Sequence, residues 1–151
     1  MVKYYLDDLK VGQRFELGSF SVSAADIVAF AERYDPQPFH LVDDPAGPFG
    51  GLVASGWQTG SLCQALLVKG FLSDMASLGS PGLEQVRFLK PVRPNTVYAA
   101  SFTVHSITPS RSRPDRGRIL GRLLLQDPEE TPVYTLDGLM MFARREPQSV
   151  E

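Results

Sequence analysis

The chain has 151 residues, of which 43% are hydrophobic, and a formal net charge of −2. This length and composition predict one globular domain, spanning 1–151, with a sizeable core. The small net charge gives no general electrostatic reason to bind nucleic acid or an anionic membrane, so we expect neither as a partner.

Two features of the chain bear on its compartment and its redox chemistry. Asp7 and Asp8 lie where a secretion signal would need its apolar segment, and polar residues interrupt the longest apolar stretch, near 62–72. We therefore expect a soluble, cytoplasmic protein. The single cysteine, Cys63, excludes an intrachain disulfide and a cysteine-rich metal site, and its place inside an apolar helix predicts an unreactive core thiol.

The first predicted elements are a short strand over 13–22 and a helix that follows it. Ser23 and Asp26 match a helix start, because the serine oxygen can accept a hydrogen bond from a free amide and the acid lies near the positive helix end. Apolar residues then recur at offsets of three, four and seven and give the helix one apolar face. Pro36 ends this helix.

The segment 34–40, YDPQPFH, follows directly. Proline fixes φ, lacks an amide donor and biases the residue before it towards extended geometry, so two prolines predict a stiff loop that is neither helix nor central strand. The loop carries Asp35 and His40, and an acid and an imidazole on one rigid loop could hold a single water between them. Taken alone, however, Asp-Pro is a common turn pair and a lone histidine is more often packed or exposed than catalytic.

A second, longer helix is predicted from Ser55-Gly56 to about Ser77, with apolar residues on more than one face. Such breadth is typical of a helix that is surrounded by other structure. From Gly82 onward the pattern changes to strands, including alternation around 98–105 and runs over 118–126 and 133–143. Together these elements predict an α+β fold in which an antiparallel sheet packs on one long helix, and a frayed tail over 144–151.

Three ordered motifs resemble those of the MaoC-like dehydratases, relatives of the R-specific enoyl-CoA hydratases. They are Asp35-Pro-Gln-Pro-Phe-His40, Leu52-Val-Ala-Ser-Gly-Trp57 and Val86-Arg-Phe-Leu-Lys-Pro-Val-Arg-Pro94. The resemblance covers a core of about 9–144. It implies the hotdog fold, a curved antiparallel sheet wrapped around a long central helix, and a homodimer or higher homo-oligomer.

The resemblance also implies an activity and a site. The reaction would add water to a 2-enoyl thioester of coenzyme A or an acyl carrier, or remove it from the 3-hydroxyacyl thioester, without a metal or redox cofactor. Asp35 and His40 would handle the water, and the backbone N–H of Gly56 would stabilise the enolate oxygen. Ser55 and Trp57, on either side of Gly56, are candidate substrate-binding residues.

The chain departs from the family pattern at two positions in these motifs. Gln37 stands where the family commonly has asparagine, and Ser55 stands where it often has histidine before the glycine. Neither change removes one of the three implied catalytic groups. Both bear on the local geometry of the loop and on the choice of substrate.

Two alternatives to the hydratase stay open at the level of sequence. A hotdog thioesterase commonly uses an acid on the central helix, and the only acid between Gly56 and Met75 is Asp74, near the far end. A non-catalytic acyl-thioester-binding subunit would predict a damaged set of catalytic groups, whereas Asp35, His40 and Gly56 are all present.

Overall fold

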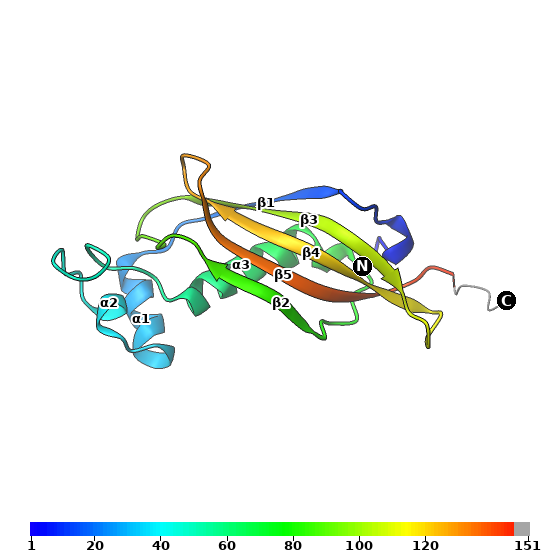
Figure 1. Ribbon diagram of the computed structural model, residues 1–151, viewed down its shortest axis with the longest axis horizontal. Helices are drawn as coiled ribbons and strands as arrows, with labels where there is room; N and C mark the ends of the chain where they lie inside the picture. The colour runs from blue at the N-terminus through cyan, green and yellow to red at the C-terminus, as the bar shows by residue number, and fades with distance from the viewer. Residues whose placement is uncertain (147–151) are drawn as a thin grey trace.

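The computed structural model describes residues 1–146, and its largest element is a five-stranded sheet with the strand order β1-β3-β4-β5-β2. All four neighbouring pairs are antiparallel. The strands are β1 (Arg14–Phe20), β2 (Gly82–Phe88), β3 (Tyr98–Pro109), β4 (Arg116–Gln126) and β5 (Pro132–Ala143). The helix α3 (Gly56–Gly70) lies along one face of the sheet, and α1 (Ala24–Tyr34) and α2 (Pro38–Leu41) lie beyond one end of it (Figure 1). This is the α+β, hotdog architecture that the resemblance implies.

The core lies between α3 and the sheet. Along β3, Tyr98, Ala100, Phe102 and Val104 are buried, as predicted, but the alternation is incomplete because Ser101, expected on the exposed side, is buried as well. Close packing in this layer explains why residue 121 on β4 is a glycine, because a Cβ there would lie 2.1 Å from the Phe102 Cζ atom. Cys63, on α3, is 1% exposed, and burial raises its pKa to about 12, which confirms the predicted unreactive core thiol.

The first helix, α1, begins and ends as the sequence predicts. The Ser23 hydroxyl accepts a hydrogen bond from the Asp26 amide at 3.1 Å, which satisfies one of the free N–H groups at the helix start. The helix ends at Tyr34, with Asp35 as its C-terminal cap.

The prediction that 34–40 is entirely loop is wrong for its second half. Residues 35–37 are non-helical, but α2 begins at Pro38 and makes one helical turn. Proline is well suited to the first position of a helix, because the amide that it lacks would have had no intrahelical partner and its φ already fits. His40 therefore lies on a helical turn.

The predicted end of the long helix at Ser77 is also wrong, since α3 ends at Gly70 and a 3₁₀ turn, η2 (Leu72–Asp74), follows. Phe71 leaves helical geometry and turns its ring into the core, 4.7 Å from the ring of Phe15 and 5.0 Å from that of Phe102. Only one face of α3 is buried within residues 1–146, so the expectation of a helix covered on several faces is not met by this chain alone.

Residues 144 and 145 contact a second 3₁₀ turn near the start of the chain, η1 (Leu6–Asp8). Arg144 donates two hydrogen bonds to Asp7, and the Arg145 guanidinium donates one to Asp8 at 2.8 Å. The predicted fraying is therefore wrong for the start of the tail, while 147–151 lie outside the described residues. In the part of the chain described, none of the helices has the length and apolar character needed to cross a bilayer.

Candidate active site

Asp35 and His40 come together where α1 ends and α2 begins. The His40 Nε2 atom lies 3.3 Å from Asp35 Oδ2, and the histidine is 6% exposed. The pairing follows from the local fold, because Asp35 caps α1 and the turn of α2 directs His40 back towards it. The structure thus brings together the two residues that the motif singled out.

The opposite nitrogen of His40 defines which tautomer the neutral ring adopts. Nδ1 lies 2.7 Å from the carbonyl oxygen of Val53. Since a carbonyl can only accept, Nδ1 must carry a proton, so the neutral ring has its lone pair on Nε2, whereas the protonated ring can donate from Nε2 to Asp35. The backbone before α3 therefore holds the imidazole in an orientation suited to proton transfer at Nε2.

The carboxylate of Asp35 is held by two further donors. Gln37 Nε2 donates to Oδ1 at 2.7 Å, and the Ser55 hydroxyl donates to Oδ2 at 2.8 Å. The hydrogen bonds from Gln37 and Ser55, with a smaller contribution from the charge of His40, lower the pKa of Asp35 below its usual value, although burial opposes them. Gln37 and Ser55, the two departures from the family pattern inside the three motifs, thus both bind this carboxylate directly.

Gly56 is the first residue of α3 and Ser55 is its N-terminal cap. The Ser55 oxygen accepts from the Trp57 amide at 3.3 Å. The Gly56 N–H has no partner in the helix, as for any first-turn amide, and the helix dipole makes it a good donor to an anionic oxygen. A Cβ at Gly56 would lie 2.2 Å from Phe88 Cε1, so the glycine lets the phenyl ring lie against the helix start.

These groups share one pocket of about 410 Å³. Asp35, His40, Gly56 and Trp57 all line it. Trp57 is 69% exposed and forms part of its wall. Ser55 is fully buried behind the Asp35 carboxylate, and its contact with substrate stays a prediction.

The family of this chain follows from its similarity to known proteins. Residues 8–117 match the family model described as MaoC like domain. The chain belongs to the MaoC-like domain family. The structure is similar to that of the MaoC-like dehydratase from Rhodospirillum rubrum, with a TM-score of 0.88 and 36% identity over 95% of this chain and 99% of that one.

Two further similarities extend this finding. The R-hydratase PhaJ1 from Pseudomonas aeruginosa matches with a TM-score of 0.68 and 25% identity, covering 97% of this chain and 90% of that one. The uncharacterized protein YdeM of Bacillus subtilis (strain 168) is 38% identical over 93 residues, which is 60% of this chain and 65% of that protein. The matched part thus spans less than two thirds of this curated relative. The family and the hotdog fold expected from the three motifs are confirmed.

Three residues of this MaoC-like pocket were not singled out from the sequence. Phe88 on β2 and Tyr134 on β5 are register partners, and Thr59 lies one turn into α3. Two of them could have been found from the sequence: Phe88 lies inside the third motif, and Thr59 lies four residues after Ser55, on the same face of the helix. Tyr134 could not, because its place depends on strand register that one sequence does not show.

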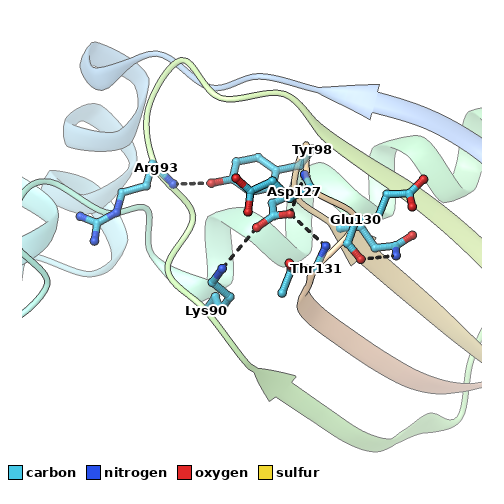
Figure 2. Close-up of polar contacts among 8 residues, drawn as sticks. Lys90, Arg93, Tyr98, Asp127, Glu130 and Thr131 are labelled. Carbon is cyan, nitrogen blue, oxygen red and sulfur yellow. Dashed lines mark hydrogen bonds and ion pairs between the residues drawn. The ribbon is translucent and has the colours of Figure 1, made fainter.

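The linker between β2 and β3 contributes residues 89–92 to the lining of the MaoC-like pocket. Lys90 is one of them, and its Nζ atom lies 3.3 Å from Asp127 Oδ2 (Figure 2). The Asp127 Oδ1 atom in turn accepts hydrogen bonds from the amides of Glu129 and Thr131. The linker is therefore tied to the turn between β4 and β5.

Proposed function

We propose that the protein is a hydratase or dehydratase that interconverts a 2-enoyl thioester and a 3-hydroxyacyl thioester. The observation that carries this proposal is that the Asp35–His40 pair and the first residue of α3, Gly56, line the same pocket. Membership of the MaoC-like family and the similarity to an R-hydratase support it. The acyl group would be carried by coenzyme A or an acyl carrier.

In the hydration direction, a water held between Asp35 and His40 attacks the β-carbon. The pair accepts one proton from the water as the new carbon–oxygen bond forms, and the electrons of the double bond move towards the thioester oxygen. The Gly56 N–H stabilises the negative charge that this oxygen gains. The α-carbon then takes a proton from the pair, so that H and OH have been added and the pair is restored. Because the addition of water leaves no electrons to be passed on, we propose that the reaction uses no redox cofactor. We also propose that it uses no metal, because the Gly56 N–H stabilises the enolate oxygen and the Asp35–His40 pair activates the water.

The test follows the conjugated enoyl-thioester absorbance on mixing the protein with a short-chain and a medium-chain trans-2-enoyl-CoA, with a free-thiol assay on the same sample. Loss of absorbance without thiol release is expected. Release of thiol would indicate a thioesterase instead. No change in either signal would exclude these plain acyl-CoA substrates, and the same absence of change with oxygenated and carrier-bound enoyl thioesters would contradict the hydratase and favour a binding role.

The geometry disfavours the thioesterase. Asp74, the only acid between Gly56 and Met75, lies in η2 after the helix has ended. Its carboxylate is 3.1 Å from Lys3 Nζ and lies outside the lining of the pocket. No acid on the helix itself is therefore available to activate water for hydrolysis.

We also propose that the chain forms a homodimer or higher homo-oligomer through the β2 edge of the sheet. The strand order leaves one side of β2 without a neighbour, and an unpaired strand edge is usually covered or paired. Large apolar side chains are exposed on β2, just after it and at the start of α3, namely Leu83, Phe88, Leu89 and Trp57. A second copy would remove this apolar surface from water.

A further inference from the structure

The chain buries two tyrosines whose hydroxyls have different surroundings. Tyr98 is 2% exposed, and its hydroxyl accepts a hydrogen bond from the Arg93 amide at 2.8 Å (Figure 2). Tyr134 is 3% exposed as a residue, but solvent reaches its hydroxyl, which makes no hydrogen bond within residues 1–146. The hydroxyl is therefore free to bind water or a ligand. Because Tyr134 lines the pocket that holds Asp35 and His40, a ligand in that pocket can replace the water.

Tyr134 lies in the lining of two pockets. Its hydroxyl oxygen lies close to α3, because a Cβ at Gly60 would lie 3.1 Å from it. One pocket holds Asp35 and His40, and the other, of about 330 Å³, is lined by α3, β2 and β5. The second pocket is largely apolar, with Leu83, Val86 and Leu136 in its lining. An acyl chain that reached from the first pocket into the second would pass Tyr134.

A second side-chain hydroxyl lies in the lining of the same pocket. Thr59, from α3, is 3% exposed and lines the pocket with Tyr134. Both groups are neutral donors, and burial, with the nearby Cys63, raises the pKa of Tyr134 to about 12, so the phenol keeps its proton. Apart from His40, the one basic side chain in the described linings of the two pockets is Lys90, which is exposed at the rim and paired with Asp127. These surroundings suit a neutral oxygen, because a buried carboxylate would need a cation.

We propose that Tyr134, assisted by Thr59, recognises a hydroxyl or carbonyl oxygen on the acyl chain beyond the reacting carbons. The preferred substrate is then an oxygenated 2-enoyl thioester rather than a plain alkyl one. This inference rests on the proposed function, since it assigns the acyl group of the same reaction. It identifies Tyr134 as a specificity residue, with no part in proton transfer.

The experiment compares trans-2-enoyl-CoA substrates in matched pairs, with either a hydroxyl or a methyl group at carbon 4, 5 or 6. The measured quantity is the ratio of kcat/KM for the hydroxyl member to that for the methyl member. For at least one carbon position we expect the ratio to exceed one by about tenfold, the scale of one well-placed hydrogen bond. Tyr134→Phe should lower this ratio towards one, and Thr59→Val should lower it by less.

Tyr98→Phe is the matched control, because it removes a buried hydroxyl that lies outside the pocket lining. It should leave the ratio unchanged even if it lowers stability. A simple structural effect of Tyr134→Phe would change both members of a pair equally and leave the ratio as it was.

The outcomes separate this inference from the proposed function. If the protein hydrates both members of every pair equally well, or prefers an acyl chain with a carboxylate, the inference is overturned and the hydratase stands. If no enoyl thioester is hydrated, the proposed function fails. Calorimetric binding of the saturated hydroxyl and methyl acyl-CoA pairs then tests Tyr134 alone, and equal affinities in the wild-type protein would overturn its assignment.

Discussion

At the scale of single residues, the site centres on the carboxylate of Asp35, which interacts with Gln37, Ser55 and His40. Asp35→Asn keeps the shape of the side chain but removes its charge, and His40→Gln removes the titrating ring. We expect each variant to lose about 10²- to 10⁴-fold in hydration rate, the range for general acid–base catalysis. Circular dichroism and thermal unfolding should show an intact fold, and a variant that keeps most of its rate would remove that residue from the mechanism.

Gln37 allows a more specific test, because its hydrogen bond is the largest contribution to the lowered pKa of Asp35. The depressed pKa keeps Asp35 ionised to lower pH than usual. Gln37→Leu should raise this pKa towards the ordinary value, so the acid limb of the kcat/KM profile should move to higher pH. The same bond stabilises the fold above the unfolded pKa of about 3.9, and this stabilisation is lost as the pH falls through the folded pKa.

A control for Gln37→Leu is Gln126→Leu, which removes a glutamine hydrogen bond to the Glu130 carbonyl, outside the lining of the pocket. Its pH profile should match that of the unmodified protein. An acid limb that stays in place in Gln37→Leu, or that moves equally in both variants, would contradict the role assigned to Gln37.

At the scale of the elements, an aromatic ring lies against the backbone of a glycine at two places, Gly121 and Gly56, and the surroundings of the two rings differ. A Cβ at Gly121 would lie 2.1 Å from Phe102, which is 0% exposed, whereas a Cβ at Gly56 would lie 2.2 Å from Phe88, which is 59% exposed. The Phe102 ring is enclosed by the core, whereas the Phe88 ring borders open space on this chain and can shift unless the proposed second copy packs against it. Gly121→Ala should therefore cost about 1–3 kcal/mol of unfolding free energy, the range for an overpacked core.

Gly56→Ala should cost much less than Gly121→Ala, because alanine also favours the helix. Urea unfolding of the two variants measures the difference directly. Equal losses would show that Phe88 is as firmly held as Phe102.

The helices show what local sequence can and cannot predict. The start of α1 was predictable from Ser23 because an N-terminal cap depends only on near neighbours. The end of α3 was not, since Phe71 leaves the helix to pack on Phe15 and Phe102, which are distant in sequence. The turn of α2 does not follow from the rule that proline ends helices, because proline at the first position of a helix favours it instead, as Pro38 does here.

The site was predictable to a similar degree. Asp35, His40 and Gly56 lie in short motifs whose order indicates the family, and the structure places all three on one pocket. The hydrogen bonds from Gln37 and Ser55 to Asp35 depend on side-chain rotamers, and the place of Tyr134 in the pocket depends on strand register. Neither can be predicted from the residue types alone. Sequence therefore indicated the chemistry better than the shape of the space around it.

At the scale of the whole molecule, the proposed assembly through β2 can be tested by its mass in solution. Leu83 on β2 is 55% exposed, and Leu83→Glu would place a charge on the proposed interface. We expect light scattering to give a dimer or larger species for the unmodified protein and a smaller one for this variant. Val11→Glu is the control, since Val11 is 65% exposed but lies before β1 at the opposite edge of the sheet.

A monomer in the unmodified protein would contradict the homo-oligomer itself. A mass that Leu83→Glu leaves unchanged, or that Val11→Glu lowers as well, would exclude β2 as the specific interface. Far-ultraviolet circular dichroism of both variants would show whether the monomer fold is retained.

The helical first half of the chain and the strands of its second half each contribute residues to the pocket, and this has a consequence for evolution. The groups proposed to react, Asp35, His40 and Gly56, lie in or beside the helical segments before the long strands, whereas Phe88 and Tyr134 belong to the sheet. If the proposed function holds, mutation or recombination in the strands would vary the acyl group while the reacting groups are inherited unchanged. Chimeras that join the first half of this chain to the strands of a relative would then differ in substrate selectivity but share the same reacting groups.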